Sequence, residues 1–320
     1  MKLSYFFIAF MTVLLGFGQV RAQLDRSYVS VSGTDSGTCG AQVSPCRDFN
    51  AAIARTNAGG VVLALDSGVY AGTNISIDRS VTLAAAPGVY AELYNTSEAS
   101  SRITVNSGGL STVILRNLFL TGKAGGTNAY GVGVGSVGNL QIENCVIDRF
   151  SEGIGAQAMQ SSAEFFIKDT IVKNSLSNGM TVYTSTGLVR AVIDHCQFVN
   201  NGTGGSSGNG IAVSYRGRVS VRDSLATSNL GAGFAVFGGD LNLDNCESSN
   251  NDDGVYAGSS VVGDQVVVGT ATVSNSLVTN NKNYGFRQFG SGVFYSLGNN
   301  NVRRNGIANT NGTITLVSGT

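Results

Sequence analysis

The stretch Leu241-Asn-Leu-Asp-Asn-Cys246 decides the fold, because similar stretches recur from the middle of the chain to its end. They follow one another about every 25 residues, and because one such unit can bury its apolar face only against the next, the period predicts a solenoid. The other copies are Leu140-Gln-Ile-Glu-Asn-Cys145, Phe166-Ile-Lys-Asp-Thr170, Val192-Ile-Asp-His-Cys196, Val219-Ser-Val-Arg-Asp-Ser224, Ala271-Thr-Val-Ser-Asn-Ser276 and the weaker Tyr295-Ser-Leu-Gly-Asn-Asn300.

Most copies are followed by a polar turn rich in Asn and then by a second short motif. This motif reads Gly-apolar-x-apolar, as in Gly179-Met-Thr-Val182, Gly210-Ile-Ala-Val213 and Gly233-Phe-Ala-Val236. Two or three short strands in each repeat, with no helical stretch between them, are typical of a parallel β-helix. The predicted fold class is therefore all-β, a parallel β-helix with a short capping helix near the N-terminus.

The composition suits closely stacked strands and gives no sign of a basic nucleic-acid-binding surface. Charged residues make up 12% of the 320-residue chain, 44 residues are Gly, and Trp is absent. The chain has 20 basic and 20 acidic residues. Removal of a leader that contains Lys2 and Arg21 would leave 18 basic and 20 acidic residues, a net charge of −2. We therefore expect no nucleic-acid partner.

Residues 1–22 are typical of a secretory signal peptide. Lys2 precedes an apolar run from Phe6 to Phe17, and Val20-Arg21-Ala22 resembles a cleavage site of small residues. The alternative is a transmembrane anchor, which the short apolar run disfavours. No later stretch is apolar enough to span a bilayer. We expect a protein secreted to the periplasm or the medium, with no membrane span.

The remaining chain is expected to form one domain with two parts, an N-terminal cap (23–60) and a parallel β-helix (61–320). The cap should contain a helix with Ser44 as its N-cap, Pro45 at its first position and Gly59 just past its end. A solenoid needs a cover over its open end, and this helix is the expected cover.

The five cysteines fall into two groups. Cys39 and Cys46 flank a short loop that a disulfide would close in an oxidising compartment. Cys145, Cys196 and Cys246 occupy one position in alternate repeats, and rungs about 4.8 Å apart would separate them by about 9.6 Å. Because this exceeds the reach of a disulfide, they are expected to be buried and reduced, with no redox role. A column of separated thiols does not converge on an ion, so we expect no metal site and no cofactor.

Two polar columns are predicted to form ladders of stacked turn residues. Stacked amides hydrogen-bond along a turn, and they tolerate the left-handed backbone conformation. The first column, just before the cysteine position, is Asn117, Asn144, Asp169, His195, Asp223, Asn245, Asn275 and Asn299, and the second is Asn174, Asn200, Asn250 and Asn280.

The repeat Val-x-Ile-x-Asn-Cys, followed by Asn-Asn and Gly-Ile-x-Val, resembles the right-handed parallel β-helix of the pectate lyase superfamily. The segments Tyr28–Asp35 and Ser44–Ile53 resemble the capping region of secreted bacterial β-helix proteins. The resemblance covers residues 27–320. It implies the fold but no single activity, because the superfamily holds lyases, hydrolases, epimerases and members without known activity. Its catalytic members act on acidic polysaccharides through carboxylates, often with an Arg or Lys base, on one outward strand face.

The outward positions of the Gly-apolar-x-apolar strands lack such carboxylates. Since the apolar residues of these strands point inward, the residue x points outward. A general acid, a general base or a calcium cluster would need Asp or Glu side chains that converge there. The outward column reads Gly133, Gly155, Thr181, Ala212, Ala235, Tyr256 and Arg287.

Asp252 and Asp253 are the weak catalytic candidates. In enzymes that resemble polygalacturonases such a pair activates water and protonates the leaving group, but the accompanying Gly-His-Gly and Arg-x-Lys are missing here. The sequence favours the alternative, a solvated polar turn. His195 is the sole histidine, and it lies in the first turn column, away from this acidic pair. We therefore expect a structural ladder residue at His195, although a general base is the alternative.

Aromatic and arginine residues beside the same strands form a predicted ligand-binding ridge. Rings and guanidinium groups along one ridge can stack on sugar rings and hold acidic groups, and the alternative is that the rings cover strand edges or stack on one another. The sequence favours a secreted, non-catalytic β-helix protein with a polysaccharide as partner. The alternative is a polysaccharide lyase or glycoside hydrolase acting on an acidic polysaccharide. The ridge residues are Tyr183, Tyr215, Arg216, Phe237, Tyr256 and Arg287, with Phe289 and Arg190 nearby.

Overall fold

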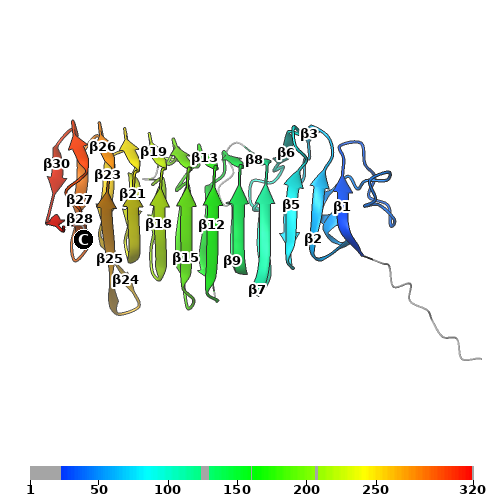
Figure 1. Ribbon diagram of the computed structural model, residues 1–320, viewed down its shortest axis with the longest axis horizontal. Coiled ribbons are helices and arrows are strands. Elements are labelled where there is room, and N and C mark those ends of the chain that lie inside the picture. Colours follow the sequence, from blue (N-terminus) through cyan, green and yellow to red (C-terminus); the bar gives the residue numbers. More distant parts are fainter. Residues whose placement is uncertain (1–22, 124–129, 160, 206–207, 319–320) are drawn as a thin grey trace, which may run out of the picture.

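The computed structural model describes residues 23–123, 130–159, 161–205 and 208–318, and it shows an elongated solenoid of stacked strands (Figure 1). The turns of the chain follow one another along the long axis, from β1 at the blue end to β30 at the red end. Strands of successive turns pair in parallel register. The predicted all-β parallel β-helix is confirmed. The predicted signal peptide, residues 1–22, lies outside the described residues.

The strands form three sets, each of which runs along the solenoid. The first set carries the Gly-apolar-x-apolar motif, and the second carries the motif that ends at the cysteine position. The first set contains β4 (Ile75–Ile77), β11 (Glu152–Met159), β14 (Met180–Thr184), β17 (Ile211–Val213), β20 (Ala232–Val236), β23 (Asp253–Ala257), β27 (Tyr284–Gln288) and β30 (Ala308–Asn311). The second contains β1 (Leu24–Val29), β2 (Thr56–Ala64), β5 (Val81–Ala85), β12 (Ala163–Lys168), β15 (Val189–Asp194), β18 (Gly217–Arg222), β21 (Gly239–Asp244), β25 (Gln265–Ser274), β28 (Val293–Ser296) and β31 (Thr315–Leu316).

Two long strands belong to both of these sets, and a separate sheet forms the third. The long strands are β7 (Ile103–Arg116) and β9 (Tyr130–Glu143). A short strand, β24 (Ser259–Val262), pairs antiparallel with the start of β25. The third set contains β3 (Gly68–Val69), β6 (Ala91–Tyr94), β8 (Leu118–Thr121), β10 (Val146–Asp148), β13 (Ile171–Lys173), β16 (Gln197–Val199), β19 (Leu225–Thr227), β22 (Glu247–Ser249), β26 (Leu277–Thr279) and β29 (Asn301–Arg303).

The alternation of side chains along the strands places the core on the solenoid axis. In β18, Val219 and Val221 are buried, whereas Ser220 and Arg222 are exposed. The buried residues form one continuous apolar cluster along the molecule. The strand register aligns the predicted outward column of the first set, and Ala212 and Ala235 in it are buried. The aligned residues are Gly133, Gly155, Thr181, Ala212, Ala235, Tyr256 and Arg287.

Both predicted turn ladders are present. In the first column every residue except Asn299 has a left-handed backbone, with φ between 48° and 58°. Side chains bond from rung to rung, as from Asn144 Nδ2 to Asn117 Oδ1 at 2.9 Å. The second column has φ between 55° and 58°, and Asn200 Nδ2 donates to Asn174 Oδ1 at 2.8 Å. Amide side chains thus support the left-handed turns that the parallel stack requires.

A third amide ladder, which the sequence analysis missed, lies inside the solenoid one residue beyond the second column. Its central members Asn201, Asn229, Asn251 and Asn281 are at most 2% exposed. The backbone N–H and side-chain amide of each donate to the side-chain oxygen of the next, ending at Asn305, with distances from 2.9 to 3.2 Å. This ladder satisfies polar groups that would otherwise be buried without partners.

Helix α1 (Phe49–Ile53) starts later and is shorter than predicted. Asp48, not Ser44, is the N-cap, and its side chain accepts from the Asn50 N–H at 2.7 Å. The helix cannot begin at Ser44 because Cys46 is extended and bridges to Val29. Gly59 lies in β2 and does not end the helix, so both predicted boundaries are wrong. Within the described ranges, no helix has the length and apolar character needed to cross a membrane.

The cysteines lie in two different environments. Cys39 and Cys46 form a disulfide, with their Cα atoms 4.9 Å apart. Cys145, Cys196 and Cys246 are free and buried. A hydroxyl from the intervening rung faces the backbone N–H of each one: Thr170 Oγ1, Ser224 Oγ and Ser276 Oγ accept at 3.3, 3.0 and 3.1 Å. The predicted single column of alternating thiol and hydroxyl positions is therefore observed.

The three buried thiols should be unreactive in the folded protein. Burial raises the pKa of Cys145 and of Cys196 to about 12, and that of Cys246 to about 11. Since the thiolate is the nucleophile, we expect no labelling by a water-soluble maleimide at mildly alkaline pH until the protein is denatured. Mass spectrometry of peptides from native and denatured samples measures this. Rapid labelling of any of the three in native protein would show that the column is assigned wrongly.

Candidate ligand-binding site

A group of rings around Arg287 lies on the outer face of the first strand set. Strand register brings Arg287 on β27 next to Tyr256 on β23. The Arg287 guanidinium lies over the rings of Tyr256, Tyr284 and Phe289, at 5.5, 5.4 and 5.6 Å from their centroids. Phe237 packs against Tyr256, with ring centroids 5.3 Å apart. We call Phe237, Tyr256, Tyr284, Arg287 and Phe289 the aromatic–arginine cluster.

Asp253 fixes the position of the guanidinium. Its Oδ2 accepts from Arg287 Nη1 at 2.8 Å, and its Oδ1 accepts from the Tyr284 backbone N–H at 3.2 Å. The hydrogen bond with Asp253 raises the pKa of Arg287 above its ordinary value, so the group stays charged. Phe289 is 58% exposed, so an aromatic residue lies open to solvent beside a fixed positive charge.

The structure gives the two weak catalytic candidates different roles. Asp252 is partly exposed and pairs with Lys282 at 3.3 Å. Asp253 is only 6% exposed and pairs with Arg287, so the prediction of a solvated turn is wrong for this residue. Asp253 thus holds the turn to the cluster through Tyr284 and Arg287, whereas Asp252 contacts Lys282.

The other predicted ridge residues lie outside the cluster. The Arg216 guanidinium lies 4.9 Å from the Tyr215 ring centroid and donates to the Thr186 carbonyl. Tyr183 lies on β14, and within the described ranges no ring contact joins it to the cluster. The predicted ridge therefore consists of the cluster, one arginine–tyrosine pair and a separate tyrosine. Part of the alternative, that rings stack on one another, is also observed, in Phe237 and Tyr256.

A second polar surface, which the sequence analysis missed, lies on the outer face of the second strand set. Strand register places Glu143, Lys168, Asp194, Arg222 and Asp244 in one row of alternating charge. The predicted absence of acidic residues concerned the outward column of the first set, and the second set carries acidic residues at its outward positions. The signal was in the repeat itself, at the polar residue just before the turn column.

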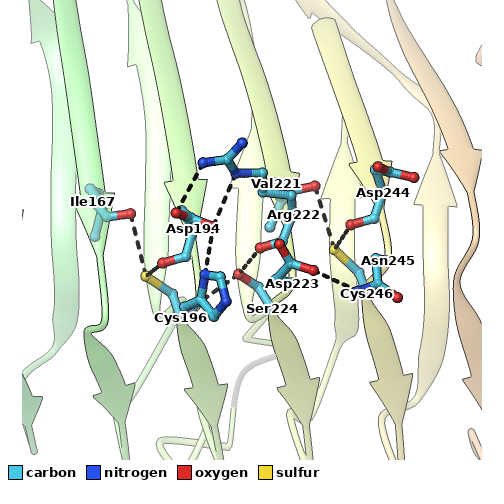
Figure 2. A network of polar contacts seen from close by, with 11 residues as sticks. Ile167, Asp194, Cys196, Val221, Arg222, Asp223, Ser224, Asp244, Asn245 and Cys246 are labelled. Carbon is cyan, nitrogen blue, oxygen red and sulfur yellow. Dashed lines mark hydrogen bonds and ion pairs between the residues drawn. The ribbon is translucent and has the colours of Figure 1, made fainter.

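Asp194 is the centre of this second surface (Figure 2). Arg222 on the next strand reaches it with two hydrogen bonds, Nε to Oδ1 at 3.0 Å and Nη2 to Oδ2 at 3.1 Å. His195 Nδ1 lies 2.7 Å from Asp194 Oδ1. The hydrogen bond from Arg222 lowers the pKa of Asp194 even though burial opposes this shift. The network therefore contains a carboxylate that remains ionised.

His195 occupies the first turn ladder, as the sequence predicts, but that prediction overlooked its carboxylate partner. Its left-handed backbone has a φ of 53°, and its side chain is 57% exposed. The ring borders an open groove of about 500 Å³ that Asp223, Asn245 and Glu247 also line. His195 thus combines a structural position in the turn with an accessible imidazole.

The fold and these two surfaces define a solenoid that presents aromatic and charged side chains on its outer faces. The chain belongs to the family described as right handed beta helix region, whose model matches residues 49–242 and 130–320. No curated protein matches the chain.

Several solved structures resemble this chain in fold. Pectate lyase Pel9A is 16% identical, with a TM-score of 0.55 over 91% of this chain and 76% of that chain. An alginate lyase from Paenibacillus sp. str. FPU-7 is 14% identical, with a TM-score of 0.58 over 83% of this chain and 95% of that chain. Tailspike protein 2 from Escherichia coli O157:H7 bacteriophage CAB120 is 10% identical, with a TM-score of 0.51 over 77% of this chain and 35% of that chain. These likenesses confirm the fold, a right-handed parallel β-helix.

Proposed function

We propose that this is a secreted β-helix protein that binds a polysaccharide on the outer face of its first strand set without cleaving it. The aromatic–arginine cluster is the observation that carries the proposal. In this account residues 1–22 are a signal peptide, residues 23–60 form a cap in which α1 covers the end of the solenoid, and residues 61–320 form the β-helix.

The cluster has the chemistry that sugar recognition uses. Exposed aromatic faces stack on the apolar faces of sugar rings, and a guanidinium donates hydrogen bonds to hydroxyl or carboxylate oxygens. Strands of successive rungs lie about 4.8 Å apart, so a ridge along them presents groups at intervals suited to a long polymer. Tyr183, Tyr215 and Arg216 lie on or beside earlier strands of the same set, where an extended chain would pass.

The pairing of the nearby carboxylates supports binding without cleavage. Asp253 is neutralised by Arg287, and Asp252 is paired with Lys282. The outward column between Gly133 and Arg287 carries no acidic side chain. General acid–base cleavage requires a carboxyl group that is free to exchange a proton with the glycosidic oxygen or with a water.

The names of the solved structures with this fold agree with a carbohydrate ligand. Two are a pectate lyase and an alginate lyase, whose substrates are acidic polysaccharides. The alternative function is therefore a polysaccharide lyase or glycoside hydrolase acting on such a polymer. One observation favours it, namely the two carboxylate–guanidinium pairs, Asp253–Arg287 and Asp194–Arg222.

Alanine substitution in the cluster tests the proposed site. Tyr256→Ala and Phe237→Ala should each weaken retention on the bound polysaccharide by about 1 kcal/mol, which is roughly fivefold in affinity, because each removes a stacking ring. Affinity electrophoresis measures retention, and thermal denaturation checks the fold. Tyr295→Ala, an outward tyrosine on the second strand set, is the matched control. Equal retention of wild type and both cluster variants would exclude the aromatic–arginine cluster, and Tyr183→Ala and Tyr215→Ala then test the rest of the ridge.

A further inference from the structure

The groove beside His195 contains an imidazole and carboxylates that could bind a cation. It is separate from the aromatic–arginine cluster. It lies at the turn that follows the second strand set, and it is lined by His195, Asp223 and Glu247 without any Lys or Arg side chain. One candidate ligand atom from each of Asp194, His195 and Asp223 lies within 4.8 Å of the others. The sequence predicts no metal site, because neither the cysteine column nor the outward column of the first strand set offers converging ligands.

The imidazole of His195 is held in the orientation of a metal ligand. Oδ1 of Asp194, the last residue of β15, lies 2.7 Å from Nδ1. Arg222 binds both oxygens of Asp194 and keeps it ionised, so Asp194 acts as the acceptor and Nδ1 carries the hydrogen. The lone pair of the neutral ring is then on Nε2. A carboxylate that accepts from the other ring nitrogen is the usual outer partner of a metal-bound histidine.

Asp223 provides the second ligand. It follows His195 by one rung in the first turn column, and its side chain is exposed on the same groove. Asn245 Nδ2 donates to its Oδ1 at 2.5 Å, which orients the carboxylate and leaves Oδ2 available. Since Arg222 balances the charge of Asp194, the carboxylates of Asp223 and Glu247 leave the groove negative overall.

We propose that this groove binds a first-row transition-metal dication such as Zn²⁺, through His195 Nε2 and the Asp223 carboxylate. Water molecules complete the coordination, and Asp194 with Arg222 forms the outer support. An imidazole with a carboxylate suits zinc and its neighbours, whereas Ca²⁺ takes six to eight oxygen ligands. The two protein ligands are on the surface, so binding is reversible and the metal is exchangeable.

The chain offers a selective probe, because His195 is its only histidine. In protein without a histidine tag, a long-range ¹H–¹⁵N NMR spectrum therefore contains signals from one imidazole. We expect the Nδ1–H tautomer before metal is added, and a shift of the Nε2 resonance when ZnCl₂ is titrated. Isothermal titration calorimetry with ZnCl₂ should give one site, and CaCl₂ should give none.

Variants that preserve the turn identify the ligands. Asn occupies other positions of this column with a left-handed backbone, so His195→Asn should fold normally and lose zinc binding. Asp223→Asn and Asp194→Asn should each weaken binding about 10- to 100-fold. Asp244→Asn, in the same outward row as Asp194, is the control and should bind like wild type. No zinc binding by wild type, unchanged binding by His195→Asn, or an Nε2–H tautomer in the free protein would each overturn the proposal.

Discussion

Ile211→Asp is expected to abolish folding. Ile211 lies on β17 with 0% exposure, inside the continuous apolar cluster. An unpaired carboxylate at this position costs roughly 5 kcal/mol or more, because it would be buried among apolar side chains. That is comparable with the whole stability of a typical domain, about 5–15 kcal/mol. Since neighbouring rungs bury one another, the loss should spread along the solenoid. Circular dichroism and limited proteolysis of the purified variant measure the result.

Ser220→Asp is the matched control for this substitution. Ser220 lies on β18 on the outward side, between the buried Val219 and Val221. A charge there stays in water, and we expect a change in stability of less than about 0.5 kcal/mol. Soluble, protease-resistant Ile211→Asp protein, or an unfolded Ser220→Asp protein, would mean that the strand faces are assigned the wrong way round.

Asn229→Ala should have the second-largest effect. Its side chain makes four hydrogen bonds in the buried ladder, accepting from the backbone and the side chain of Asn201 and donating to the Phe198 carbonyl and to Asn251. Alanine leaves several buried groups without partners, and each costs about 1–3 kcal/mol. We expect a loss of on the order of 4 kcal/mol, measured by urea denaturation.

Asn242→Ala provides the comparison, because Asn242 is an exposed, outward asparagine on β21. Its removal should change the free energy of unfolding very little. Equal stability of Asn229→Ala and Asn242→Ala would show that the interior ladder does not stabilise the solenoid.

The strand faces could be predicted because they follow from alternation within a repeat. Val219 and Val221 point inward and Arg218 and Arg222 outward wherever the chain is extended, and the period places each rung on the next. The cysteine column and both exposed ladders follow from the same repeat period. These features depend only on the alternation within a strand and on the repeat period. Both can be read from a single sequence.

The errors arose where distant contacts override a local pattern. Ser44-Pro45 is a good helix start, but the bridge between Cys46 and Val29 keeps this segment extended. The helix therefore begins at Asp48. The interior ladder was missed because Asn201 and its equivalents look like ordinary turn residues. Their burial depends on how tightly each turn closes over the core.

The network around Asp194 shows a further limit of sequence reasoning. Adjacent residues in a strand point to opposite faces, so Asp194 and His195 would not be expected to meet. The left-handed backbone at His195 turns its ring back towards Asp194, and parallel register brings Arg222 from the next rung. The aromatic–arginine cluster was only partly predictable, because the ring contacts of Arg287 depend on side-chain conformation and not on spacing.

A screen of the mature protein against uronic-acid polymers tests the central claim most directly. Affinity electrophoresis follows binding, and absorbance of unsaturated products together with a reducing-end assay follows cleavage. The account predicts that at least one polymer is retained, that Tyr256→Ala weakens this retention, and that wild type and Asp253→Asn both release no products. Cleavage by wild type that disappears in Asp253→Asn, or failure to retain any of the polymers, would contradict it.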